Sequence, residues 1–355
     1  MKKAALHNLG CKVNAYETEA MQQMLEEAGY EIVPFSEKAD VYVINTCSVT
    51  NMADRKSRQM LHRAKKRNPD AAVVAAGCYV QTKENEAKCD EAIDILIGNN
   101  QKKELVERLD AFFAGRGEKV EAVVDINHEK QAFEELTLDH AAEHTRAFIK
   151  VQDGCNQFCT YCIIPYIRGN YRSVPMEDLI GQAKELVANG AKELILVAQE
   201  TTLYGIDLYG EKSLHKLLDE LNKINGLFWI RIMYCYPEEI YEDLIDSMIR
   251  NEKVCHYLDI PIQHSNDTML KRMGRRTSHD DLVRIITHLR ERIPDITLRT
   301  TLICGFPGET QEIHEELMQF INDMEFDRLG AFTYSPEEGT PAAAFEDQVD
   351  EELKK

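Results

Sequence analysis

The sequence predicts an α/β protein built from an N-terminal doubly wound parallel sheet followed by a partial TIM-like barrel of six strand–helix units. Two observations predict this class. Short apolar strands alternate with amphipathic helices along the chain, and this alternation is typical of parallel sheets. A polar, acidic stretch over residues 128–145 interrupts the pattern and is expected to be a linker. We therefore expect one domain over 1–127 and a second over 146–355.

The first half is expected to contain five strands and two main helices. One helix, over Glu17–Ala28, has apolar residues at a 3.6-residue period and ends before Gly29, a common helix terminator. The other, over Asp54–Arg67, ends before Pro69. The predicted strands of this half are Lys3–Leu9, Val41–Asn45, Ala72–Ala76, Ile93–Gly98 and Val120–Ile126.

The second half is expected to contain six strands with helices between them, such as Met176–Asn189 and Gln311–Met324. Six such units suggest a TIM-like barrel that is incomplete, in which chemistry belongs to the carboxyl ends of the strands. The predicted strands are Phe148–Val151, Glu193–Ala198, Phe228–Tyr234, Tyr257–Ile262, Thr297–Ile303 and Arg328–Thr333.

Composition indicates a cytoplasmic protein with no membrane partner. The chain is 44% apolar and 29% charged, which is ordinary for a globular protein. No apolar run approaches the roughly 18 residues of a membrane helix, and the start MKKAALHNLGC is too short in apolar residues for a signal peptide. In a reducing compartment, ten cysteines are expected to be ligands, catalytic groups or core residues and not disulfides.

The charge is −19 and is unevenly distributed, with 36 acidic residues against 22 basic ones over 147–355. Such an acidic chain is not typical of nucleic-acid binders. One basic stretch, RKSRQMLHRAKKR, nevertheless carries seven Lys and Arg and no acid. It fits either a solvated helix face or a contact with RNA phosphates. Its candidate substrate contacts are Arg55, Lys56, Arg58, Arg63, Lys65, Lys66 and Arg67.

Three cysteines of the first half follow three predicted strands. Cys11, Cys47 and Cys78 each lie just past a strand's carboxyl end, and in a doubly wound sheet these ends meet at the edge where ligands bind. Gly10 and Gly77 directly precede two of them and permit close approach of the backbone. A single cysteine at a strand end is usually a small core residue. Three such cysteines predict a shared site.

Three more cysteines, Cys155, Cys159 and Cys162, follow the first strand of the second half in the stretch DGCNQFCTYC. Thiolates at this spacing suit either an iron–sulfur cluster or zinc. A structural zinc site needs a fourth ligand, and the nearest histidines, His140 and His144, lie upstream in the linker. Three ligands on a four-iron cluster leave one iron open for a substrate or cofactor.

The Cys-x3-Cys-x2-Cys pattern, with Tyr161 before its last cysteine and after the first strand of a βα barrel, resembles the signature of radical S-adenosylmethionine enzymes. The chain as a whole resembles the MiaB/RimO-like methylthiotransferases, in LGCKVNAYETE, INTCSVT, GCYVQ, GCNQFCTYCIIPYIRG and GFPGET. The resemblance implies an N-terminal methylthiotransferase domain over 1–127 and a radical barrel over 146–355. No counterpart of that family's small β-barrel domain, called TRAM, is expected within these residues.

The two parts of the chain resemble two different branches of that family. Up to about residue 165 the chain resembles the branch that acts on threonylcarbamoyladenosine next to the tRNA anticodon, in LHNLGCKVNAYETEA and NTCSVTNMADRKSRQ. Beyond it, the chain resembles the branch that modifies an aspartate of a small-subunit ribosomal protein, in IRGNYRSVPMEDL, LVAQETTLYGIDLYG and FDRLGAFTYSPEEGTPAA.

The main expectation for the acceptor is the tRNA nucleoside, which the basic stretch favours. The ribosomal protein is the alternative, which the acidic second half favours because ribosomal proteins are basic. A non-catalytic metal or iron–sulfur module is a third hypothesis, against which the two three-cysteine sets argue.

The resemblance implies two 4Fe-4S clusters and S-adenosyl-L-methionine as cofactors. Cys155, Cys159 and Cys162 would hold the first cluster, whose open iron binds the amino and carboxylate groups of S-adenosylmethionine. Cys11, Cys47 and Cys78 would hold the second cluster, which presents the sulfur to be inserted, with a methyl group, at an unactivated C–H bond. Because cluster and cofactor carry this step, no other catalytic residue is expected. A flavodoxin or ferredoxin type of protein would supply electrons.

Six residues are candidate contacts for S-adenosylmethionine: Tyr161, Gln199, Glu200, Gln263, Gly305 and Glu309. Gln199 and Glu200 end the second barrel strand and are expected near the methionine end of the cofactor. Gln263 is expected near the ribose, and the segment GFPGE near the adenine or the ribose. Each could equally be a polar loop residue at the barrel rim. Arg168 and Arg172, past the cysteine loop, are candidates for substrate contact or for solvated arginines.

Overall fold

The computed structural model describes residues 1–115, 117–127, 133–136, 138 and 145–354. The chain divides into two compact units. Unit 1 comprises 1–142 together with 164–172, and unit 2 comprises 143–163 and 173–355. The second unit begins close to the predicted boundary at residue 146. The segment 164–172, expected in the barrel, belongs to unit 1 instead, and most of the predicted linker lies outside the described residues.

Unit 1 contains one six-stranded parallel sheet with the strand order β2-β1-β3-β4-β5-β6. The order reverses between β1 and β3, as in doubly wound folds, and this reversal marks the usual ligand-binding point at the carboxyl ends of the strands. The strands are β1 Lys3–Asn8, β2 Glu31–Ile32, β3 Val41–Thr46, β4 Ala72–Gly77, β5 Ile95–Ile97 and β6 Val120–Ala122. The α/β class and the doubly wound sheet are confirmed.

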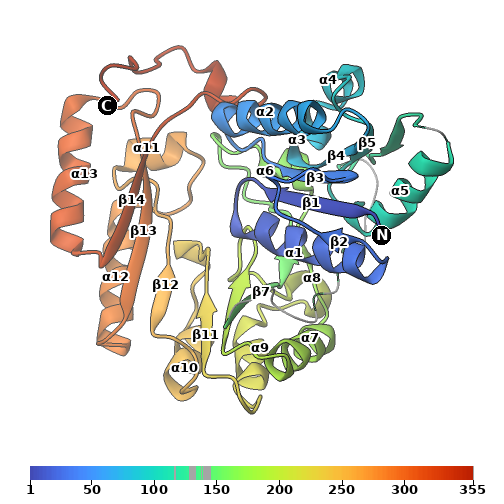
Figure 1. Ribbon diagram of the computed structural model, residues 1–355. Coiled ribbons are helices and arrows are strands. Elements are labelled where there is room, and N and C mark those ends of the chain that lie inside the picture. The colour runs from blue at the N-terminus through green and yellow to red at the C-terminus, as the bar shows by residue number, and fades with distance from the viewer. Residues whose placement is uncertain (116, 128–132, 137, 139–144, 355) are drawn as a thin grey trace. The chain divides into compact units, whose positions relative to one another are not determined.

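Helices cover both faces of this sheet, and Figure 1 shows α1 and α2 on opposite sides of the strands. Alternate residues along each strand therefore belong to different cores. Val43 and Val74 pack with α1 and α5, whereas Ile44 and Val73 pack with α2. The helices of the unit are α1 Lys12–Glu27, α2 Asn51–Arg67, α3 Cys78–Thr82, α4 Glu84–Cys89, α5 Leu105–Ala114 and α6 Ile164–Arg168, with a 3₁₀ turn at Lys102–Glu104.

The two predicted helices begin earlier than expected. The first begins at Lys12 and not at Glu17, with Cys11 as its N-cap residue. The second begins at Asn51, because the Thr50 side chain accepts a hydrogen bond from the Ala53 amide and caps the first turn. The first helix thus starts at the residue after Cys11, and the second starts a short turn after Cys47.

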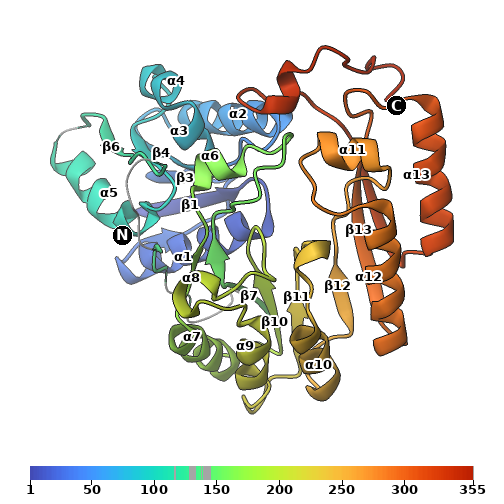
Figure 2. The ribbon, with the colours of Figure 1, turned by 180° about the vertical axis from the view of Figure 1, so that it is seen from behind.

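Unit 2 contains the six predicted barrel strands, all parallel, in two three-stranded sheets ordered β7-β10-β11 and β12-β13-β14. A parallel bridge between Ile230 and Val254 continues the arrangement from the first sheet toward the second. In Figure 2 the strands β10, β11 and β12 run side by side, with α9, α10 and α12 beside them. The barrel strands are β7 Arg146–Lys150, β10 Glu193–Val197, β11 Trp229–Ile232, β12 Tyr257–Asp259, β13 Thr297–Cys304 and β14 Arg328–Thr333. Two further strands, β8 Gln152–Asp153 and β9 Arg172–Ser173, form a separate two-stranded sheet, and β9 lies at the point where the chain passes from one unit to the other.

The helices between these strands complete the βα pattern. They are α7 Met176–Ala188, α8 Ile206–Tyr209, α9 Leu214–Leu221, α10 Glu242–Arg250, α11 Asp267–Arg272, α12 His279–Arg292 and α13 Gln311–Met324, with 3₁₀ turns at Pro237–Glu239 and Pro341–Ala344. In the part of the chain that the structure describes, none of the helices combines the length and the apolar character needed to cross a bilayer.

Candidate cluster and cofactor sites

The three cysteines of unit 1 lie at the carboxyl ends of adjacent strands. Cys47 directly follows β3, Cys78 directly follows β4, and Cys11 follows β1 after a two-residue turn. The pairing register brings Asn8 opposite Asn45 and Thr46 opposite Gly77, so the three strands end at the same level. The predicted grouping of these cysteines therefore matches the sheet topology.

Two glycines allow the backbone to pass close to these cysteines. Gly10 has φ of 104°, and a Cβ added to it would lie 2.9 Å from both Cβ and Sγ of Cys47. Gly77 has φ of 92°, and an added Cβ would lie 2.7 Å from Oδ1 of Asn45. Only glycine fits such a conformation with this contact distance. The turn that carries Cys11 is thus packed directly against Cys47.

Burial disfavours free thiolates at this site. Cys47 and Cys78 are 5% and 2% exposed. Burial, reinforced by neighbouring cysteines, raises the pKa of Cys47 to about 12 and also raises the pKa of Cys11. The Arg168 guanidinium acts in the opposite direction on both. Cys11 and Cys47, whose thiolates are disfavoured by burial and favoured by nearby positive charge, are suited to binding a metal centre.

Among the described residues, no three His, Cys, Asp or Glu side chains converge to hold one metal ion. In a four-iron cluster each thiolate binds a different iron, so the ligands stand farther apart than those of a single ion. The donor set of three soft thiolates and the glycine-lined approach fit such a cluster. The residues present in unit 1 are therefore compatible with a 4Fe-4S group.

The second set, Cys155, Cys159 and Cys162, lies in the loop after β8 of unit 2. The Cys162 amide donates to the Cys159 carbonyl oxygen at 3.0 Å, and the Thr160 amide donates to the Met273 carbonyl oxygen at 3.0 Å. These bonds fold the loop back on itself and fix it to the end of α11. Burial raises the pKa of Cys155 to about 12.

Two residues that the sequence analysis did not single out lie beside this loop. The Tyr236 hydroxyl is 2.6 Å from Sγ of Cys159, and the Arg275 guanidinium lies 3.7 Å above the Tyr236 ring. Arg275 also donates to the Pro261 carbonyl oxygen and is 6% exposed. A buried cation stacked on the tyrosine beside a thiol suits an anionic iron–sulfur centre. Tyr236 lies 77 residues from Cys159 in sequence and Arg275 lies farther still, so sequence spacing gives no sign of this grouping.

Three predicted cofactor contacts of the barrel have buried polar atoms without a hydrogen-bond partner among the described residues. They are both amide atoms of Gln199, Oε2 of Glu200 and Oε1 of Gln263. Buried polar atoms are normally paired, so unpaired ones indicate a site for a polar ligand. The other carboxylate oxygen of Glu200 accepts a hydrogen bond from the Thr202 amide at 2.9 Å, and burial raises the pKa of Glu200 to about 8. These residues fit the polar groups of S-adenosylmethionine.

Glu309 and Tyr161 have structural partners. The Glu309 carboxylate accepts hydrogen bonds from the Gly305 amide at 2.6 Å and the Phe306 amide at 3.1 Å, and its other oxygen is 2.9 Å from Nδ1 of His314. It holds the GFPGE turn in shape, and its contact with a cofactor stays a prediction. Tyr161 packs edge-on against Phe306 in an apolar cluster.

The basic residues predicted as substrate contacts divide into three groups. In α2, Lys65 pairs with Asp94 at 2.8 Å, Arg58 pairs with Asp54 at 3.5 Å, and Arg67 donates to the Phe35 carbonyl oxygen. Four others on α2 are exposed: Arg55, Lys56, Arg63 and Lys66. In the segment 164–172, Arg172 is partly buried, and Arg168 is 1% exposed. Arg168 is therefore not at the surface of its unit, where a substrate contact was expected.

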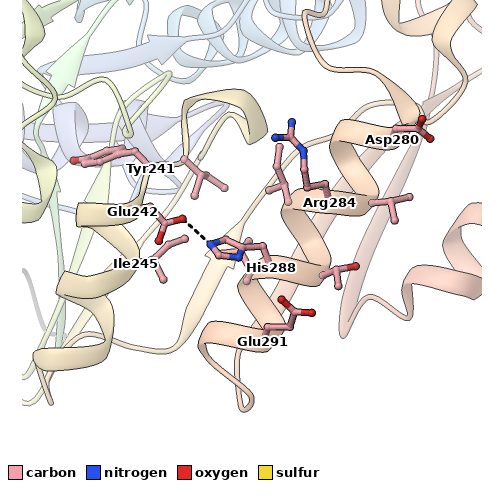
Figure 3. Close-up of a pocket in the computed structure, with 12 residues that line it drawn as sticks. Tyr241, Glu242, Ile245, Asp280, Arg284, His288 and Glu291 are labelled. Atoms are coloured by element: carbon pink, nitrogen blue, oxygen red, sulfur yellow. Dashed lines mark hydrogen bonds and ion pairs between the residues drawn. The ribbon is translucent and has the colours of Figure 1, made fainter.

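A groove of 710 Å³ lies between α10 and α12 of unit 2. Figure 3 shows His288 of α12 reaching Glu242 of α10, an ion pair of 2.6 Å. The lining of this groove is mainly apolar, with Ile240, Tyr241 and Ile245 on one side. It contains no cysteine and none of the predicted contact residues, so the groove and the cofactor candidates are separate features.

Comparison with family models gives two matches. Residues 3–98 match the Uncharacterized protein family UPF0004, and residues 149–321 match the Radical SAM superfamily. The first range contains Cys11, Cys47 and Cys78, and the second contains Cys155, Cys159 and Cys162.

Curated relatives match almost the whole chain. A protein of Lachnoclostridium phytofermentans named "Ribosomal protein uS12 methylthiotransferase RimO" is 45% identical over 98% of this chain and 79% of its own length. A protein of the same name from Clostridium perfringens is 45% identical over 99% of this chain and 79% of its own.

Solved structures with a similar fold are distant in sequence. The radical S-adenosylmethionine methyltransferase TsrM from Kitasatospora setae has a TM-score of 0.66 at 16% identity, covering 96% of this chain and 75% of TsrM. The cobalamin-dependent radical enzyme OxsB has a TM-score of 0.60 at 11% identity, covering all of this chain and 56% of OxsB. At these identities the likeness concerns the fold alone.

Proposed function

The chain belongs to the MiaB/RimO-like family of radical S-adenosylmethionine methylthiotransferases, and from that premise we propose that it methylthiolates ribosomal protein uS12. The observation that carries the proposal is the 45% identity, over 98% of the chain, to a relative named for that acceptor. The identity extends over both halves. The residue modified would be an aspartate, as the resemblance of the second half implies.

The charge of the chain supports a protein acceptor. Residues 147–355 carry 36 acidic against 22 basic side chains, and an acidic surface attracts a basic partner. The expectation of a tRNA acceptor, drawn from the first half of the sequence, finds no counterpart in the names of these relatives. We therefore place the ribosomal protein first.

The roles of the residues follow from their positions. We assign the first cluster to Cys155, Cys159 and Cys162 and the second to Cys11, Cys47 and Cys78. S-adenosylmethionine and the clusters, when bound, would supply the radical that removes a hydrogen atom from an unactivated C–H bond and the sulfur that takes its place on the carbon. The chain's own part is to orient them: the unpaired polar atoms of Gln199, Glu200 and Gln263 would bind polar groups of S-adenosylmethionine.

The cofactor assignment is tested by counting iron and sulfide after anaerobic reconstitution. We expect about eight irons per chain for two four-iron clusters. Cys47→Ala and Cys155→Ala should each retain about half of that amount, because each removes a ligand from one site only. Cys89→Ala, which changes an exposed cysteine outside both sets, is the control and should retain all of it. Zinc bound without sulfide would refute the assignment.

The acceptor is tested by offering the reconstituted protein small ribosomal subunits and tRNA in separate reactions. Mass spectrometry should find one added sulfur atom and one added methylene on an aspartate of uS12, and none on tRNA nucleosides. The same addition on threonylcarbamoyladenosine alone would overturn the proposal. The second candidate acceptor, tRNA, has one observation in its favour: α2 carries four exposed cations, Arg55, Lys56, Arg63 and Lys66.

A further inference from the structure

A buried set of charged and amide side chains lies behind the three cysteines of unit 1. It is formed by Asn14 and Glu17 of α1, Asn99 and Lys102 after β5, and Arg168 of α6, and each is at most 1% exposed. All five belong to unit 1, although Arg168 follows Cys162 by only six residues. Ionised groups this deeply buried are retained only where they are paired.

The ion pairs within this set are close. Arg168 donates from Nη1 to Oε1 of Glu17 at 2.8 Å and from Nη2 to Oε2 at 3.2 Å, a two-bond pair that fixes the guanidinium plane. Nζ of Lys102 lies 3.2 Å from the same carboxylate. Arg168, Lys102 and Glu17, counted without their other neighbours, carry a net charge of +1. Another buried carboxylate of the unit, Glu134, accepts a hydrogen bond from the Lys103 amide.

The set is joined to two cysteines by hydrogen bonds. Arg168 donates to Oδ1 of Asn14 at 2.8 Å, and that oxygen is 3.8 Å from Sγ of Cys11. At the other end, Lys102 donates to Oδ1 of Asn99 at 3.0 Å, and the Asn99 amide nitrogen is 3.7 Å from Sγ of Cys78. Asn99 also donates to the Ile167 carbonyl oxygen at 2.7 Å, which fixes the helix that carries Arg168.

Arg168 therefore pairs with a carboxylate on one side, and on the other it is separated from Sγ of Cys11 by a single side chain, Asn14. A four-iron cluster with three thiolates is an anion, and it becomes more negative on reduction. In a buried site such an anion is stabilised by fixed positive charge nearby, and that charge also raises its reduction potential.

We propose that Arg168 is a positioning residue of the three-cysteine centre, where its guanidinium, oriented by Glu17 and Asn14, supplies the counter-charge for an anionic cluster held by Cys11, Cys47 and Cys78. The inference rests on the cofactor assignment proposed above and concerns neither the acceptor nor turnover. It explains why the segment 164–172, which follows Cys162, belongs to unit 1.

The test uses the full chain with Cys155, Cys159 and Cys162 all changed to alanine, so that one cluster remains. Its midpoint potential is measured by dithionite titration followed by electron paramagnetic resonance, with iron and sulfide counted in the same samples. In this background, Arg168→Met should shift the one-electron reduction equilibrium about tenfold toward the oxidised form, which is about 59 mV to lower potential. Arg168→Lys should keep most of the parent potential because the charge remains.

Glu17→Gln should shift the midpoint potential in the opposite direction. It removes a buried negative charge while keeping a hydrogen-bonding side chain, so the potential should rise. Arg172→Met, four residues from Arg168 and bonded to backbone carbonyl oxygens of Asn170 and Arg168, is the matched control and should leave the potential unchanged. If Arg168→Met fails to bind iron, the shift in Glu17→Gln decides the question.

Two outcomes would overturn the inference: an unchanged potential in Arg168→Met with a full complement of iron, or shifts of the same sign in Arg168→Met and Glu17→Gln. The second outcome would mean that both variants merely distort the site. Absence of iron in the parent would refute the cofactor assignment instead, so the two failures are distinguishable.

Discussion

Gly10 shows, at the scale of one residue, how a missing side chain shapes the cysteine site of unit 1. Its left-handed backbone and its contact with Cys47 together leave no room for a Cβ. The same contact brings the Cys11 and Cys47 backbones together. Substitution there should therefore disturb ligand geometry in addition to raising backbone strain.

We expect Gly10→Ala to lower stability by about 1–3 kcal/mol and to reduce the iron retained at this site. The matched control is Gly29→Ala, which is in the same unit and has φ of 85° but no atom within 4 Å of an added Cβ. The control should lose stability through strain alone and keep its iron. Urea unfolding of the apo-protein and iron analysis measure the two effects. Equal iron loss in both variants would contradict this account.

Gln199 provides a second test at the residue scale, because its buried amide has no partner among the described residues. A buried amide without a partner has lost its hydrogen bonds to water and gained none within the protein. Replacing it by an apolar group of similar size removes this desolvation penalty. Gln199→Leu should therefore leave the apo-protein as stable as the parent, or more stable. Binding of S-adenosylmethionine should weaken about tenfold, because about one hydrogen bond to a charged ligand is lost. Thermal melting and equilibrium dialysis measure these. Unchanged binding would remove Gln199 from the cofactor site.

At the scale of elements, α2 does more than cover the sheet. Its buried Ser57 side chain accepts a hydrogen bond from the Cys47 amide at 3.1 Å and lies 3.1 Å from the Cys47 carbonyl oxygen. The helix thereby holds the backbone of Cys47, a proposed cluster ligand ten residues away. This coupling links the stability of α2 to the geometry of the site.

Ser57→Ala should leave the buried Cys47 amide without a partner, at a cost of about 1–3 kcal/mol, and should lower iron retention. Thr50→Ala removes the cap of the same helix at a cost of about 1 kcal/mol but leaves the Cys47 amide bonded. The two variants should therefore differ in iron content more than in unfolding free energy. Full iron in Ser57→Ala would show that α2 does not hold the ligand.

Elements with plain apolar patterns were predictable from the sequence. The six barrel strands and most strands of unit 1 are confirmed because their short apolar or β-branched runs stand out in the sequence. The start of α1 was not predictable, because Asn14 and Glu17 occupy core-facing positions where helical periodicity expects apolar residues. The two-residue strand β2 is too short to show a period. The partner of Glu17 lies 151 residues away, so sequence spacing gives no sign of it.

At the scale of the whole molecule, the two units are interleaved along the chain. Unit 1 is completed by residues 164–172, after the chain has already contributed 143–163 to unit 2. A cut at the apparent sequence boundary therefore does not separate two complete units.

A fragment of residues 1–142 should consequently fold poorly, because it lacks Arg168 and so removes one ion-pair partner of the buried Glu17 carboxylate. Removing one partner of a buried ion pair costs about 3–5 kcal/mol. Adding a synthetic peptide of residues 164–172 should restore cooperative thermal unfolding, whereas the same peptide with Arg168→Met should not. A fragment that melts cooperatively without the peptide would contradict this expectation.

The ion pair between Glu17 and Arg168 also bears on the exchange of segments between relatives. The two residues lie 151 positions apart in sequence. A chimera joined anywhere between them would take its carboxylate from one parent and its guanidinium from the other. Such a chimera would keep the pair only where both parents carry it, so this contact restricts where related chains can be joined.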